Sequence, residues 1–131
     1  MFIFNIQIPT DNFDQSNDIG SINFESFVKE FEKFDWIGNI NLANQIQKVS
    51  PTLSVKNDSD KSVLWVSAYL NDNVLEYIIG FVRKVEKTFL GIWNREVDEH
   101  RQMETKDLIE VENLFSSYFR GEYEDLFNVL K

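Results

Sequence analysis

Few side chains of this sequence could carry acid–base or nucleophilic chemistry. His100 is the single histidine among the 131 residues, and the sequence contains no cysteine. A histidine-centred triad needs a serine and a carboxylate beside the imidazole, whereas Asp98, Glu99 and Arg101 surround this one with charge. We therefore interpret His100 as a solvent-exposed side chain, and we predict no catalytic residue.

Metal binding and carboxylate chemistry have little more support. Without cysteine, and without HxxxH or ExxH spacing, the sequence predicts no metal site and no cofactor. The pairs Asp58/Asp60 and Glu122/Glu124 could serve as acid and base in a hydrolase. A turn explains the first pair and a helix N-terminus explains the second. A carboxylate-based hydrolase stays open as a remote alternative.

The negative charge is concentrated at the two ends of the chain. The formal net charge is −9. Residues 1–35 carry seven acids against two bases, residues 36–95 carry five acids against seven bases, and residues 96–131 carry ten acids against four bases. A field of this sign repels nucleic acids and anionic membranes and attracts basic proteins. We therefore predict a protein partner, and neither a nucleic acid nor a membrane.

The acids of the C-terminal third form the candidate binding surface. They occupy a charged connection, the exposed face of the helix that follows it and the start of a last helix, and few lysines at i,i+4 accompany them. A surface of one sign speeds the capture of a partner of opposite sign. The candidate partner-binding residues are Asp98, Glu99, Glu104, Asp107, Glu110, Glu122, Glu124 and Asp125.

The first half of the chain predicts one strand and two helices. Residues 1–8 alternate as a strand, and residues 10–20 form a polar loop. From Ser21 onward, phenylalanines recur at helical spacing as far as residue 34, with Ser21 as the N-cap. The segment Trp36-Ile37-Gly38 breaks this helix, and residues 39–49 form the next one.

The second half predicts a sheet followed by two helices. The strands are expected at residues 52–56, 63–69, 75–85 and 88–97. Because short turns join them, an antiparallel meander is the simplest pairing. A helix capped by Thr105 or Asp107 then runs to Phe119, Gly121 ends it, and a short amphipathic helix closes the chain.

These elements predict one α+β domain covering residues 1–131. Its four-stranded antiparallel meander is covered on one face by the N-terminal and C-terminal helices. Aromatic residues make up 15% of the chain, enough for a core without disulfides. The residues expected in that core are Phe27, Phe31, Trp65, Ile79, Phe115 and Phe127. The start of the chain has neither a basic region nor a long apolar run, so we expect no signal peptide, no membrane span and a cytoplasmic location.

Four short strings carry a resemblance to a known class of proteins: Phe34-Asp35-Trp36, Ser50-Pro51-Thr52-Leu53-Ser54-Val55, Leu64-Trp65-Val66-Ser67-Ala68 and Tyr118-Phe119-Arg120-Gly121-Glu122-Tyr123. With them the chain resembles small bacterial immunity proteins of the polymorphic-toxin and contact-dependent growth inhibition type. The resemblance implies a gene beside that of a toxin, and stoichiometric neutralisation of a toxin domain that is frequently a basic nuclease. It implies no catalytic residue.

The hypothesis from the sequence is thus an immunity protein, a monomer or weak dimer, that binds a basic toxin domain through an acidic surface. The alternative is a non-catalytic adaptor or interaction domain, including one of phage origin, that binds a protein partner through an aromatic surface. The two differ in the response to salt, because steering by exposed charges is screened over about 8–10 Å at physiological ionic strength.

Overall fold

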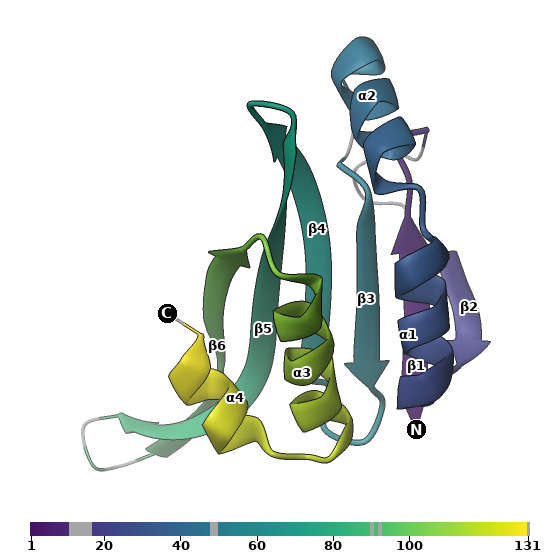
Figure 1. The fold of residues 1–131 in the computed structure, drawn as a ribbon. Helices are drawn as coiled ribbons and strands as arrows, with labels where there is room; N and C mark the ends of the chain where they lie inside the picture. Colours follow the sequence, from purple (N-terminus) through teal and green to yellow (C-terminus); the bar gives the residue numbers. More distant parts are fainter. Residues whose placement is uncertain (11–16, 48–49, 90, 92, 131) are drawn as a thin grey trace.

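The computed structural model describes residues 1–10, 17–47, 50–89, 91 and 93–130. Within these residues the chain forms one antiparallel sheet and four helices (Figure 1). In chain order the elements are β1 (Phe2–Gln7), β2 (Asn17–Ser21), α1 (Phe24–Lys33), α2 (Trp36–Ile46), β3 (Thr52–Asn57), β4 (Val63–Asn71), β5 (Val74–Phe89), β6 (Trp93–Thr105), α3 (Leu108–Phe119) and α4 (Tyr123–Val129).

The sheet has six strands in the order β2-β1-β3-β4-β5-β6. The predicted meander is present as β3–β6, but the prediction of four strands is wrong because β1 and β2 extend the sheet beyond β3. The pairing of β1 with β3 joins distant parts of the chain, which local patterns do not specify. The segment Asn17–Ser21, expected in a loop, contains one strong β-former, Ile19, and is a strand through its pairing with β1.

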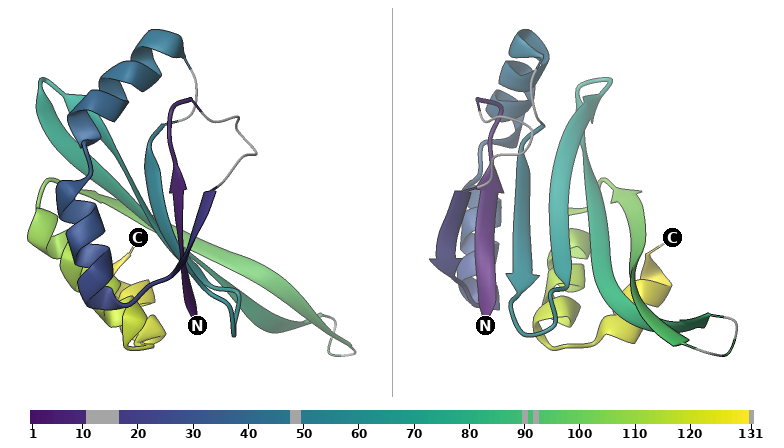
Figure 2. Two further views of the ribbon diagram at one scale, coloured as in Figure 1. Left: turned by 90° about the vertical axis from the view of Figure 1, so that its right-hand side faces the viewer. Right: turned by 180° about the vertical axis from the view of Figure 1, so that it is seen from behind.

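All four helices lie on one face of the sheet, as expected (Figure 2). Asn23, and not Ser21, caps α1 by accepting a hydrogen bond from the Ser26 backbone N–H at 2.8 Å. Asp35 caps α2, so that this helix starts at Trp36, where the sequence predicted a break. Among the described residues no helix is long and apolar enough to span a bilayer.

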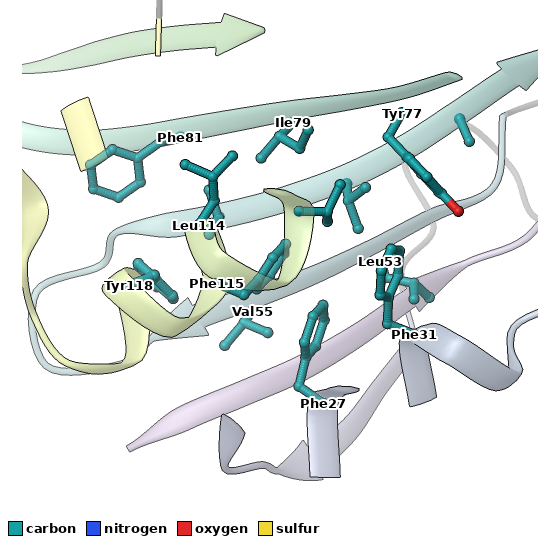
Figure 3. Close-up of a cluster of buried hydrophobic side chains, with 14 of the residues drawn as sticks. Phe27, Phe31, Leu53, Val55, Tyr77, Ile79, Phe81, Leu114, Phe115 and Tyr118 are labelled. Carbon is teal, nitrogen blue, oxygen red and sulfur yellow. The ribbon is translucent and has the colours of Figure 1, made fainter. Parts of the chain in front are cut away.

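The core lies between the helices and the sheet (Figure 3). The rings of Phe27 on α1 and Phe115 on α3 stack at 4.0 Å, which joins the two helices above the strands. Phe31, Ile79 and Phe127 are buried with them, as predicted. The prediction for Trp65 is wrong, because strand alternation directs its neighbours Leu64 and Val66 into the core and Trp65 to the opposite face.

Strands β5 and β6 form a long hairpin whose tip reaches past the helices (Figure 2). They span 16 and 13 residues, so that the stretch predicted as a charged connection before α3 is an edge strand. Charged residues dominate β6, which disguised the strand in the sequence. Charge is, however, a common protection of an exposed sheet edge against pairing with another chain.

Candidate functional site

The helix-free face of the sheet is the candidate site. We use this name for the face opposite the helices, formed by residues that alternate with the core positions of each strand. One row of paired residues crosses all six strands on this face, from β2 to β6: Asp18, Asn5, Ser54, Trp65, Gly80 and Gln102. This row is mostly small or polar, and Trp65 is its one large ring.

Trp65 lies across the neighbouring strand at Gly80. A Cβ atom placed on Gly80 would come within 2.2 Å of the indole carbons Cε2 and Cζ2. Gly80 therefore provides the space for the ring, and the ring in turn covers the glycine backbone. On the other side of Gly80, the ring of His100 on β6 lies nearly parallel to the indole, with ring centroids 6.2 Å apart and planes inclined by 20°. The two rings form an aromatic patch on β4–β6.

Acids outnumber bases around this patch. Alternation along the strands places the following charged residues on the helix-free face: Asp18, Glu76, Glu86, Glu96, Asp98, Glu104, Lys56 and Lys84. Lys84 is neutralised by Asp98, with Nζ and Oδ1 2.9 Å apart. Glu86 and Glu96 stand directly opposite each other in the β5–β6 pairing, with no ion pair to any described cation. Like charges at such a position oppose the pairing of the strands.

A hydrogen-bonded cluster closes the face near the end of β6. The hydroxyl of Tyr69 donates to the carboxylate of Glu76 and lies 3.1 Å from Oε2 of Glu104. The bond from Tyr69 lowers the pKa of Glu76, and Lys106 adds an ion pair at 3.5 Å. The same bond raises the pKa of the Tyr69 hydroxyl. Tyr69 is thereby kept as a proton donor between two carboxylates, which is a structural role.

A shallow hollow occupies the other half of the face, over β1 and β3. It has a volume of about 380 Å³ and is lined by Ile3, Asn5, Asp18, Ser54, Lys56, Asp58 and Val63. Asn5 donates a hydrogen bond to Asp18 across the hollow at 2.7 Å. Its polar groups are mixed in sign, so that the hollow itself has no pronounced preference for a cation or an anion.

The eight predicted binding residues do not form one surface. Asp98 and Glu104 lie on the helix-free face, whereas Glu99 alternates to the helix-covered side of β6. On that same side, Glu122 pairs with Arg120 at 2.8 Å and Glu124 pairs with Arg83 at 2.7 Å. Asp125 is exposed in the first turn of α4.

The last two predicted residues support the start of α3. Asp107 is its N-cap and accepts a hydrogen bond from the Ile109 backbone N–H at 2.9 Å. Glu110 accepts a hydrogen bond from the Thr105 hydroxyl at 3.2 Å. Both carboxylates therefore have local partners, and they lie at the start of α3, after β6 with Asp98 and Glu104 has ended.

The sequence analysis missed the contact between Trp65 and Gly80, although the sequence contains a signal for it. A glycine in the middle of an apolar strand often marks the close approach of another group, and Gly80 interrupts the run Tyr77-Ile78-Ile79 and Phe81-Val82. The tryptophan that fills the space is not identified by that signal, because the pairing partner depends on the strand register.

The hydroxyls that lie beside carboxylates are held in structural hydrogen bonds, as the Thr105 hydroxyl is with Glu110 at 3.2 Å. The imidazole of His100 contacts Trp65 and makes no hydrogen bond within the described chain. Ser62 donates to Asp60 at 2.6 Å, but it is only 1% exposed, and its hydroxyl also donates to that of Tyr123 at 3.1 Å and lies 3.3 Å from that of Tyr118. This buried network ties the β3–β4 turn to α3 and α4. No group of three acids or histidines among the described residues could hold a metal ion.

Comparison of the chain with protein-family models, with curated proteins and with solved structures found no match. The observations that bear on function are therefore those on the helix-free face itself.

Proposed function

We propose that the protein binds a basic protein domain through the helix-free face of its sheet and neutralises that domain stoichiometrically, as an immunity protein neutralises its toxin. The observation that supports this most directly is the excess of carboxylates around an exposed aromatic patch on a face that no helix covers. Such a combination of a central aromatic anchor and a charged rim is common in protein interfaces.

The opposed carboxylates of Glu86 and Glu96 favour a basic partner over an uncharged one. Their repulsion works against the hairpin in the free protein. A lysine or arginine brought between them would relieve that repulsion and gain two ion pairs at once. The cost within the free protein is thus converted into affinity in the complex.

The arrangement also favours binding over catalysis. Among the groups that could move protons, Glu76 and Tyr69 are engaged in structural bonds and Ser62 is buried, and no described carboxylate or hydroxyl orients His100 through a hydrogen bond. The hollow over β1 and β3 is open and shallow, which suits a protein surface better than a small substrate that must be shielded from water.

The test is the rate of association with a basic toxin domain, which the proposal expects to be encoded beside the gene of this protein. The variant Glu86→Gln with Glu96→Gln removes two charges from the helix-free face. The matched control Glu25→Gln with Asp125→Asn removes two exposed charges from the first turns of α1 and α4. We expect the first variant to slow association about two- to tenfold at low salt and the control to change it less.

The salt dependence separates this proposal from an adaptor that uses aromatic contacts alone. Association of the parent protein should slow as salt rises, while dissociation changes less, because screening acts on the long-range approach. Association that is constant from low to high salt, together with equal rates for the two variants, would contradict the proposal.

A further inference from the structure

The aromatic patch on the helix-free face has the geometry to receive one particular side chain. Trp65 presents one side of its indole to the backbone of Gly80 and stays partly exposed on the other. The nearly parallel ring of His100 adds aromatic surface toward the edge strand β6. Because the contact with Gly80 fixes the ring against the sheet, a group that stacks on Trp65 finds the surface already in place and loses little side-chain freedom there.

Elsewhere in the protein, arginine side chains lie over an aromatic ring. On the helix-covered side, the guanidinium carbons of Arg83 and Arg101 lie 4.1 Å and 4.0 Å from the centre of the Phe127 ring. These are the cations over rings in the described part of the chain, so that Trp65 has none. Indole binds cations more strongly than phenyl does, and yet the stronger ring is the one without a cation.

Hydrogen-bond acceptors border the patch on β6. Gln102 is paired with Gly80 and therefore lies beside the indole in the same row. Glu104 is the next residue of β6 on the same face and is exposed, with its Oε2 atom 3.1 Å from the Tyr69 hydroxyl. An amide oxygen and a carboxylate thus stand at the side of the ring where the edges of a stacked planar cation would point.

We infer that Trp65 and His100 are the seat of an arginine side chain of the basic partner, with Gln102 and Glu104 accepting hydrogen bonds from its guanidinium group. This inference rests on the proposed function, because it names the side chain by which a basic partner is recognised. A planar guanidinium stacks on an indole and keeps its N–H groups free at the edge, whereas the ammonium of lysine is compact and more strongly hydrated. The seat therefore prefers arginine to lysine.

The experiment compares two synthetic peptides, hexa-arginine and hexa-lysine, which carry the same charge. Binding is followed by the NMR signal of the Trp65 indole N–H and of the His100 ring in the intact protein. We expect hexa-arginine to bind about two- to fivefold more tightly, as an exposed cation–aromatic contact provides. The variant Trp65→Leu should bind the two peptides equally. Because this variant lacks the indole, its binding is followed by the backbone N–H signals of β4 and β6.

The control is Trp93→Leu, which removes an exposed tryptophan near the hairpin tip, outside the patch. This variant should keep the full preference for arginine. If Trp65→Leu does not fold, Trp65→Phe retains a ring that contacts Gly80, and it should give a preference between that of the parent and equality.

The outcomes separate this inference from the proposal on which it rests. Equal affinity for the two peptides, or an arginine preference that survives in Trp65→Leu, overturns the arginine seat. If both peptides still bind in a salt-dependent way, the helix-free face remains the proposed receptor for basic proteins. If neither peptide binds at low salt, both the seat and the proposed function are wrong.

Discussion

The two faces of the sheet treat the same kinds of side chain differently. On the helix-covered face aromatic rings stack on one another, as Phe27 and Phe115 do, or lie beneath the protein's own arginines, as Phe127 does. On the helix-free face Trp65 has His100 beside it and nothing charged above it among the described residues.

The charges differ in the same sense. Glu122 and Glu124 on the helix-covered side are paired with arginines at 2.8 Å and 2.7 Å. Glu86 and Glu96 on the helix-free face oppose each other, and neither makes an ion pair with a cation of the described residues. The rings and carboxylates just named on the helix-covered side are paired with one another or with arginines, whereas the helix-free face has, among the described residues, an indole without a cation and two carboxylates without an ion pair. This contrast, more than the total charge of −9, supports the proposal of a binding surface.

The largest expected effect tests the assignment of the two faces. Truncation of a stacked core ring, Phe115→Ala, should lower the free energy of unfolding by about 3–5 kcal/mol. Trp65→Ala should lower it by less than half as much, because one side of that ring already faces water. Urea denaturation of both variants gives the two values. Equal losses would mean that Trp65 belongs to the core, as its aromatic character suggested from the sequence.

The second prediction concerns the space at Gly80. Gly80→Ala places a methyl group within 2.2 Å of the indole, so that Trp65 must move, at a cost of about 1–3 kcal/mol. In the background Trp65→Ala the same substitution meets no ring and should cost nothing, or stabilise the strand slightly. A double-mutant cycle measures the coupling between the two positions. A coupling near zero would show that the ring does not rest on Gly80.

The helix-covered face was largely predictable from the sequence. Helical periodicity reports directly which side of a helix is buried, and the spacing in α1, α3 and α4 correctly gave Phe27, Phe31, Phe115 and Phe127. The alternation of apolar residues in β5 gave Ile79. Asp107, one of the two cap candidates beside Thr105, is the cap of α3. The meander β3–β6 was also predicted, since short turns fix the pairing of consecutive strands.

The helix-free face was not predictable to the same degree. Its central contact joins Trp65 to Gly80 across a strand pair, and a shift of one residue in register would exchange the two faces. The acids near the end of the chain were treated as one surface because they were counted along the sequence. Alternation in β6 instead sends Asp98 and Glu99 to opposite sides.

The third prediction concerns Glu112 and Glu32, two carboxyl groups that lie close together on the helix-covered side without a cation between them among the described residues. Partial burial and the nearby carboxyl of Glu32 raise the pKa of Glu112 to about 7. Folded Glu112 therefore holds a proton between about pH 4.5 and pH 7 that the unfolded chain has released, and the stability from this proton is full below pH 4.5 and is lost as the pH rises toward 7.

Glu112→Gln removes this loss. The difference in unfolding free energy, variant minus parent, should therefore be about 1 kcal/mol larger at pH 8 than at pH 5. Thermal denaturation at both pH values measures the difference, and Glu110→Gln, on the same helix, serves as the control. A variant that differs from the parent by the same amount at both pH values would contradict the close approach of Glu32 and Glu112.

The smallest expected effect on the fold is the one that bears most directly on the comparison of faces. Removing the opposed charges in Glu86→Gln with Glu96→Gln should leave the free energy of unfolding unchanged or raise it by about 0.2–1 kcal/mol, since like charges directly opposite each other destabilise a strand pair. The gain should shrink as salt screens the repulsion.

The same variant is expected to associate more slowly with a basic partner, so that stability and binding change in opposite directions. A surface kept only for solubility gives no reason for the two carboxylates to remain opposed, whereas a receptor for a cation does. Urea denaturation at low and high salt, run beside the association measurement, provides both quantities. A variant that loses stability would show that the two carboxylates support the hairpin. The side chains of the helix-free face would then be satisfied within the folded protein, as those beneath the helices are.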